Sequence, residues 1–152
     1  MSTAPILNGQ VIGQAHYATR ALLERAITPL GISFGQALAL NVLADGAVDR
    51  ARLVHRITST LKVDEPAVHA VIAQLVDADL AQVGDRAPAG DGEPQVSLTE
   101  SGRVTQGRIG AAVADITARL YVDIPTDEMS TAARVLALVT DRANTELAAV
   151  PT

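Results

Sequence analysis

The sequence has no cysteine and no tryptophan, and aromatic residues make up only 2% of its 152 residues. Without cysteine there is no disulfide framework and no thiolate metal site, which suits a reducing compartment. No window approaches the roughly 18 uninterrupted apolar residues that a membrane span requires. The opening residues, MSTAPILNGQ, lack the basic region and apolar stretch of a signal peptide. We therefore expect a cytoplasmic protein that has no membrane partner.

The chain also has few features of an enzyme. Its histidines, His16, His55 and His69, lie far apart in sequence, and none belongs to an HExxH or similar ligand spacing. The segment 84–92 contains glycines but neither GK[ST] nor GxGxxG, so it does not indicate a phosphate-binding loop. Asp91 and Glu93 are typical of a solvated turn. We expect no catalytic residues, no cofactor and no metal, with a metal-regulated variant using His and carboxylates across a dimer as the alternative.

Apolar residues make up 48% of the chain, enough for the core of one domain of this length. They are mostly Ala, Val and Leu, which favours closely packed helices. From about residue 5 to 29 they recur at helical spacing, and Pro29 and Gly31 end the pattern. The expected fold class is therefore mainly α.

Two helices are predicted next from their capping residues. Ser33 and Gln36 have the S-x-x-Q spacing of a capping box, in which each side chain satisfies the other residue's free backbone N–H. A helix over about 35–44 follows. Asp49 is placed to cap the next helix, over about 50–61.

The central stretch of the chain has the pattern of a helix-turn-helix. Asp64 is an expected N-cap, and Pro66 lies in the first turn, where its missing N–H costs nothing. Leu61 and Val63 of the preceding turn can pack under both helices. The second helix, over 64–80, has one apolar face. Its members are Val68, Val71, Ile72, Leu75 and Val76.

Beyond residue 80 the period changes from helical to alternating. The runs LAQV (80–83) and QVSL (95–98) flank a segment rich in Gly, Pro and Asp, which predicts a β-hairpin with one buried face. Thr99 is then placed to cap a helix over about 100–120, with Glu100 at the positive end of its dipole. A hairpin beside a helix-turn-helix is a winged helix.

The run ITSTLKVDEPAVHAVIAQLVDADLAQ, followed by a loop and VSLTESGR, resembles the MarR family of winged helix-turn-helix transcription regulators. The resemblance covers nearly the whole chain. It implies one MarR-like domain over residues 1–152, with the winged helix at about 33–100. It also implies a base of dimerisation helices at about 5–29 and 100–149. The implied protein is a ligand-responsive homodimer that binds a pseudo-palindromic operator in double-stranded DNA.

The last helix supports the expectation of a dimer. Asp123 to Pro125 break the preceding helix, and Thr126 is placed to cap the final one. One side of this helix is apolar, and Val135 and Leu138 form a second apolar stripe with no obvious partner in a single chain. A second subunit would cover this stripe, whereas the alternative is a monomeric bundle that buries both stripes.

DNA binding depends mainly on cations that neutralise phosphates, whereas base edges give specificity. In the regulator interpretation, Arg86 enters the minor groove, and Glu65, His69 and Gln74 face the major groove. The expected phosphate contacts are Arg50, Arg52, Arg56, Lys62 and Arg103. For each arginine the alternative is a solvated helix surface.

The charge balance points to a second interpretation. The chain carries a formal charge of −5, and residues 47–110 contain seven basic and nine acidic residues. The second helix of the motif has four acidic residues and no Lys or Arg, and Ala70 stands near where the family commonly has an arginine. The alternative is a winged-helix dimer with weak or lost DNA binding that acts as a small-molecule sensor or a protein-interaction module.

The resemblance also implies a pocket for a small aromatic or anionic effector between the dimerisation helices and the winged helix. His16, Tyr17 and Arg20 lie within about one turn of the first helix. With Phe34 and Gln36 they could hold an anion against an apolar wall. The alternative is a half-buried tyrosine among polar neighbours.

Overall fold

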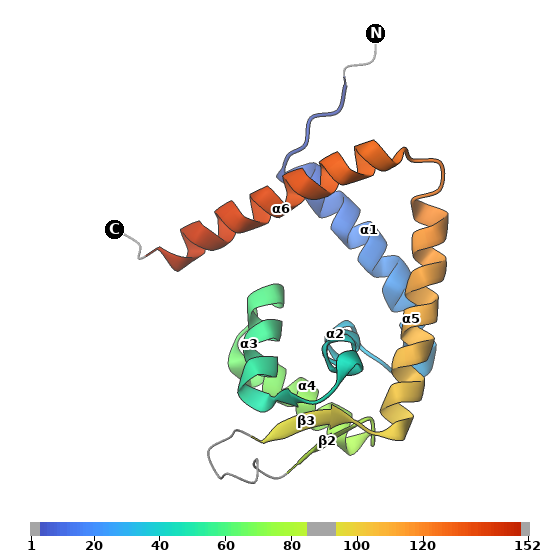
Figure 1. The fold of residues 1–152 in the computed structure, drawn as a ribbon, viewed down its shortest axis with the longest axis vertical. Helices are drawn as coiled ribbons and strands as arrows, with labels where there is room; N and C mark the ends of the chain where they lie inside the picture. Colours follow the sequence, from blue (N-terminus) through green and yellow to red (C-terminus); the bar gives the residue numbers. More distant parts are fainter. Residues whose placement is uncertain (1–3, 85–93, 150–152) are drawn as a thin grey trace. The chain divides into compact units, whose positions relative to one another are not determined.

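The structure, a computed structural model, describes residues 4–84 and 94–149. The chain divides into two compact units, residues 1–116 and 117–152, and each is described by itself. The first unit contains most of the helices and strands, and all of them except β1 are labelled in Figure 1. They are α1 (Gly9–Ile27), α2 (Phe34–Val42), β1 (Val48–Asp49), α3 (Arg50–Leu61), α4 (Glu65–Asp77), β2 (Ala81–Val83), β3 (Gln95–Leu98) and most of α5 (Glu100–Leu120).

Helix α1 begins later than its apolar pattern suggested. Asn8 caps it by accepting a hydrogen bond from the backbone N–H of Val11 at 2.9 Å, so Ile6 and Leu7 precede the helix. Their apolar side chains remain exposed, at 75% and 43% of their surface. At its other end the helix runs into a 3₁₀ turn, Thr28–Leu30, and Gly31 closes this turn at φ 74°, a left-handed conformation that favours glycine.

The predicted capping box at the start of α2 is confirmed. Ser33 Oγ accepts from the backbone N–H of Gln36 at 3.2 Å, and Gln36 Oε1 accepts from the backbone N–H of Ser33 at 2.9 Å. The helix ends at Val42 and is followed by a 3₁₀ turn, Leu43–Asp45.

The helix-turn-helix is confirmed, with α3 matching its predicted bounds. Asp64 accepts a hydrogen bond from the N–H of Ala67 at 3.2 Å and so caps α4. Several details of the prediction were wrong, and one of them is Val76 of the expected apolar face, which is 39% exposed. Asp49 makes no side-chain cap on α3, because its Oδ1 instead accepts from Gln95 Nε2 at 3.2 Å. Val63 is 40% exposed rather than tucked under both helices. Helix α4 ends at Asp77, because Asp79 turns the chain at φ 61°.

The predicted hairpin is confirmed, and a third strand joins it. Strands β2 and β3 pair antiparallel with Ala81 opposite Leu98, and the short β1 pairs with the other edge of β3. The strand order is therefore β1-β3-β2. Two residues are too few to show an alternating pattern, so β1 could not be predicted from the sequence. The backbone N–H of Arg50, the first residue of α3, donates to the carbonyl of Pro94, just before β3, at 2.9 Å. The start of α3 is therefore bonded to the segment that leads into β3.

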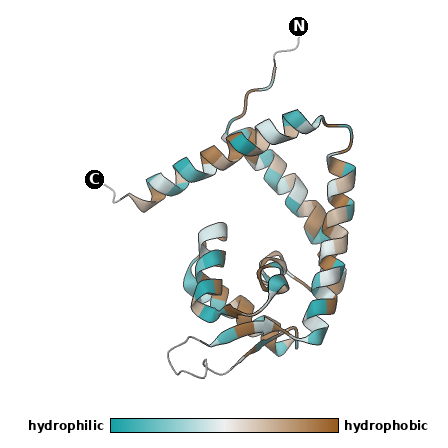
Figure 2. Ribbon diagram, in the orientation of Figure 1, coloured by the Kyte–Doolittle hydropathy of each residue, from teal (hydrophilic) through white to brown (hydrophobic). Residues whose placement is uncertain are grey.

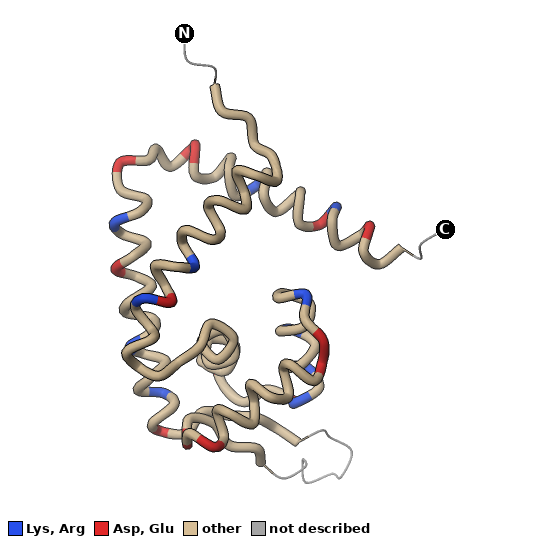
Figure 3. Tube along the Cα trace, turned by 180° about the vertical axis from the view of Figure 1, so that it is seen from behind, with Lys and Arg blue, Asp and Glu red and all other residues tan. Residues whose placement is uncertain are grey.

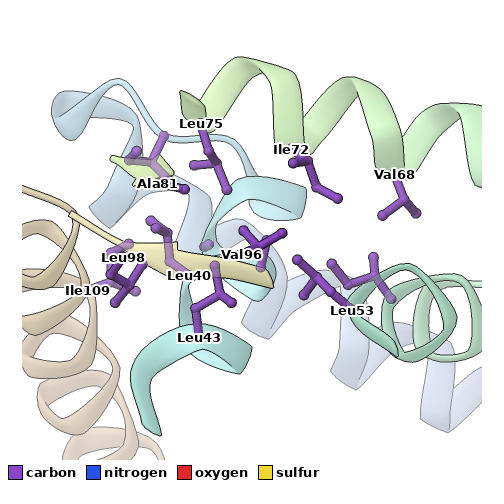
Figure 4. Packing of buried hydrophobic residues seen from close by; sticks show 14 of the residues in the cluster. Leu40, Leu43, Leu53, Val68, Ile72, Leu75, Ala81, Val96, Leu98 and Ile109 are labelled. Carbon is purple, nitrogen blue, oxygen red and sulfur yellow. The ribbon is translucent and has the colours of Figure 1, made fainter. Parts of the chain in front are cut away.

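One apolar core joins these elements. Val68, Ile72 and Leu75, all at most 1% exposed, point from α4 toward Leu53 of α3 and Val96 of β3 in Figure 4. Leu40 and Leu43 close the same core from the α2 side. Because α4 packs on both α3 and the sheet, its outward face is held in a fixed orientation next to the hairpin.

Thr99 caps α5, as predicted, and it also ties the start of the helix to the turn before β2. Thr99 Oγ1 accepts from the N–H of Gly102 at 2.9 Å and donates to the carbonyl of Asp79 at 2.6 Å. Gly102 is buried, and a Cβ on it would overlap the carbonyl oxygen of Leu80. The LTESG sequence therefore needs glycine at its last position.

The second unit holds the end of α5 and helix α6 (Thr126–Ala148). The break at 123–125 is confirmed, and Asp123 lies at φ 61°. Thr126 was wrongly predicted as the cap: it is the first residue of the helix, and Pro125 occupies the cap position without a side-chain hydrogen bond. Apolar and polar residues alternate along α6 in Figure 2, and Leu136, Leu138 and Val139 are each at least 40% exposed in the single chain.

Within residues 4–84 and 94–149, none of the helices has both the length and the apolar character of a membrane span. One pair of helices has them only in combination, Gly9–Leu30 with Phe34–Asp45, and this pair is bent by 86°.

Candidate nucleic-acid interface and effector hollow

Arg52 and Arg56 lie on one exposed side of α3. The two residues are four positions apart, so their side chains project from the same helix face. They line a polar hollow of about 480 Å³ with Asp49 and Gln95, which belong to the strands beside the helix. This arrangement places two cations next to the hairpin, where they are accessible to the phosphates of a duplex.

Arg50 and His69, which the sequence could not place together, are in contact. Arg50 Nη2 lies 3.2 Å from His69 Nδ1, joining the first turn of α3 to the exposed face of α4. Both residues line a hollow of about 210 Å³ that His55, Thr58 and Glu65 also border. Arg50 is therefore engaged inside the helix-turn-helix rather than projecting alone from it.

The other residues predicted to contact DNA lie on different elements. Lys62 is exposed and ends α3 at φ 58°, and Arg103 is exposed in the first turns of α5. Glu65 is exposed at the start of α4. Arg86 lies outside the described residues.

Gln74 is bonded within the chain. Its Oε1 accepts from Gln36 Nε2 at 3.1 Å, and Gln36 also completes the capping box with Ser33. Next to this bond, a Cβ on Gly35 would lie 3.3 Å from Cγ2 of Val71, so α2 and α4 approach closely here. Gln36 therefore links α2 to α4, and no described contact groups it with His16, Tyr17 or Arg20.

Positive and negative residues are mixed on the helix-turn-helix. Figure 3 shows both signs along this part of the trace. Asp64 and Glu65 stand at the N-terminus of α4, where the helix dipole favours acidic groups, while the arginines lie on α3. Of these two helices, only α3 carries Lys or Arg.

Arg20 and Phe34 of the predicted effector site meet. The Arg20 guanidinium carbon lies 4.2 Å from the centre of the Phe34 ring, and its Nε donates to Glu24 Oε1 at 2.6 Å. The rings of His16 and Tyr17 are tilted by 59° to each other with their centres 5.4 Å apart, and Tyr17 is 70% exposed. This pair lies on the outer surface of α1.

Phe34 also lines an apolar hollow of about 190 Å³ between α1, α2 and α5. Its other lining residues are Leu23, Ala37, Leu38, Asn41, Gln106, Ile109, Gly110 and Val113. Sequence reasoning missed all of these, because each fits the ordinary pattern of a packed helix. The polar groups at Asn41 and Gln106 are the only signals that such a face could hold more than core residues.

The geometry defines a winged helix-turn-helix with an apolar hollow beside it. No protein-family model and no curated protein matches the sequence. Many solved structures do match the fold. A mutant MarR from E. coli complexed with operator DNA is 22% identical, covers 86% of this chain and 91% of its own, and has a TM-score of 0.70.

Two further structures are of proteins that are linked to small molecules. BpsR of Bordetella bronchiseptica, whose DNA binding is regulated by 6-hydroxynicotinic acid, is 20% identical, with 93% and 98% coverage of the two chains and a TM-score of 0.72. CouR of Rhodococcus jostii RHA1, bound to p-coumaroyl-CoA, is 16% identical, with 87% and 90% coverage and a TM-score of 0.75. The chain has the winged-helix fold of the MarR-family regulators, which confirms the resemblance and the fold class expected from its sequence.

Proposed function

We propose that this protein is a cytoplasmic, dimeric transcription regulator of MarR type that binds double-stranded DNA and responds to a small effector, and that it is not an enzyme. The observation that carries the proposal is the fixed corner of α3 and α4 beside the hairpin. Arg52 and Arg56 lie next to that corner. A structural neighbour with the same fold is complexed with operator DNA. The proposed base contacts come from α4 and Arg86, and the phosphate contacts from α3, Lys62 and Arg103.

The test is a titration of the full protein into a labelled duplex from upstream of its own gene, at low and at moderate salt. Binding that weakens steeply with salt is expected, because each phosphate contact releases counterions. Absence of binding at low salt would favour the second function below.

The second candidate is a winged-helix dimer with weak or lost DNA binding, acting as a small-molecule sensor or protein-interaction module. The observation that favours it is the absence of Lys and Arg from α4, which carries Glu65 and Asp77 instead. The net charge of −5 points the same way.

The proposed dimer is supported by apolar side chains that the single chain leaves exposed. In the second unit these include Leu120, Tyr121, Val122 and Ile124, each at least 39% exposed. Contiguous exposed apolar residues favour an interface, and a twofold dimer would present two copies of α4 to successive turns of the major groove.

The proposed effector is a small aromatic acid. Its ring fits the apolar character of the hollow, and the Arg20 guanidinium over Phe34 supplies a cation for the carboxylate. We expect 4-hydroxybenzoate, used as the probe at about 100 times its Kd, to raise the Tm by roughly 5–10 °C.

A variant pair tests where the probe binds. Gly110→Leu is expected to abolish the shift, because the new side chain enters the hollow that Gly110 lines. Gly107→Leu, on the same helix and facing open space, is expected to keep it. An equal shift in both variants would place the probe elsewhere.

A further inference from the structure

The contact between Arg50 and His69 determines which hydrogen-bonding group α4 offers to DNA. Arg50 is held at its backbone, because its N–H donates to the carbonyl of Pro94 at 2.9 Å. Its side chain is half-buried, and its Nη2 lies 3.2 Å from His69 Nδ1. His69 is the fifth residue of α4, in the half of the helix that enters the major groove in helix-turn-helix proteins.

The chemistry of the pair fixes the roles of its atoms. A guanidinium has only donors, so His69 Nδ1 must act as the acceptor. An imidazole that accepts at Nδ1 is neutral and carries its proton on Nε2. The ring therefore presents an N–H donor at Nε2, while its Nδ1 side is held by α3.

We propose that Arg50 is a positioning residue and that His69, through its Nε2–H, is a specificity-determining residue for a base with an acceptor in the major groove. The best match is guanine, whose N7 and O6 are both acceptors, and the worst is cytosine, which offers an amino donor there. This inference rests on the proposed DNA-binding function and adds the chemistry of one base contact. It changes the role of Arg50, which the sequence had suggested as a phosphate contact.

The surroundings of the pair suit this role. Glu65 lies one turn before His69 on α4, and His55 faces the same hollow from α3. Neither replaces the arginine, since the atom in contact with His69 Nδ1 is Arg50 Nη2. Gln74, also predicted to read bases, has its Oε1 bonded to Gln36 Nε2 at 3.1 Å, so α2 fixes its orientation as α3 fixes that of His69.

The first test uses the free protein and needs no DNA. Nitrogen-15 NMR of the histidine rings, assigned with a His69→Gln variant, should show an unprotonated Nδ1 and a protonated Nε2 in His69. Arg50→Ala should move the Nδ1 resonance, whereas Arg52→Ala, which removes the same charge from the same helix, should not. An Nδ1 resonance that Arg50→Ala leaves in place would overturn the pairing.

The second test measures readout, using a pool of duplexes randomised over about 20 base pairs, two helical turns. The unmodified protein should enrich guanine at one position of each half-site. His69→Ala, Arg50→Ala and the double variant should all lose this preference to the same extent. On a fixed duplex, Arg52→Ala should reduce the salt slope by about 1 per subunit, and Arg50→Ala should leave it unchanged.

Each remaining outcome is decisive. If Arg50→Ala lowers the salt slope and keeps the guanine preference, Arg50 is a phosphate contact and the inference is wrong. If the protein binds duplex with a steep salt slope but enriches no base, the readout is wrong and the proposed function stands. If it binds no duplex at low salt, both the readout and the proposed function fail, and the NMR result still reports on the pair.

Discussion

Replacing Gly102 by alanine is expected to lower the free energy of unfolding by about 3 kcal/mol, the upper end of the usual cost of overpacking. A Cβ at this position would overlap the backbone carbonyl oxygen of Leu80 and approach Cδ2 of Leu98. That carbonyl accepts from the N–H of Thr99 at 3.1 Å, so it cannot move without disturbing the start of α5. The Tm should fall by roughly 6–12 °C in a thermal melt.

Gly107→Ala is the matched control for this effect. Gly107 lies on the same helix, and a Cβ there meets nothing within 4 Å. Alanine at an open helical position stabilises by about 0.5–1 kcal/mol, because it restricts the unfolded chain more than glycine does. Equal changes in the two variants would show that Gly102 does not pack against the hairpin as described.

Replacing Arg52 and Arg56 together by alanine is expected to weaken DNA binding on the order of a hundredfold or more at moderate salt. The slope of log affinity against log salt should become less steep by about 2 per subunit, which is one for each lost phosphate contact. Both side chains are exposed beside the hairpin, and α4 has no cation to compensate for them. The loss should be similar for all sequences, because phosphate contacts carry no sequence information.

A double variant with the same change in charge separates local contact from net charge. Arg25→Ala with Arg134→Ala removes two exposed arginines, from α1 and α6. This control should keep most of the salt slope. If it loses as much slope as the Arg52 and Arg56 variant, the binding would follow overall charge, and α3 would not be the contact surface.

Local patterns were sufficient to predict most of the fold. The spacing of Val68, Ile72 and Leu75 predicted the buried face of α4, and the Ser33 and Gln36 pair predicted the start of α2. These features depend on neighbours three or four residues away, so they are visible in one segment. Asp49 does occupy the N-cap position of α3, but its side chain bonds Gln95, 46 residues later, and makes no bond to the helix.

The site was less predictable because its contacts join distant segments. His69 and Gln74 were identified as polar residues on the outer face of α4, but their partners Arg50 and Gln36 are 19 and 38 residues away. The same holds for the apolar hollow that Phe34 lines, because its residues come from α1, α2 and α5. A single sequence shows which residues are polar, whereas only the packed helices show which of them are already paired.

Gln36 gives the proposed effector response a physical route that the sequence did not suggest. It follows Phe34, which lines the hollow, by two residues, and it bonds Gln74 of α4 at 3.1 Å. A ligand that shifts the first turn of α2 would therefore also act on α4. Such coupling requires two conformations of the protein that differ in the position of α4. The ligand must bind one of these conformations more tightly than the other.

The corner of α3 and α4 is proposed to bind DNA and to distinguish between sequences. The most direct measurement compares the Kd of the full protein for its own upstream duplex with the Kd for a shuffled duplex of equal length and composition, at moderate salt. We predict that the upstream duplex binds at least about 10³ times more tightly, as specific regulators do. Equal affinities for the two duplexes, or no binding to either at low salt, would contradict the account.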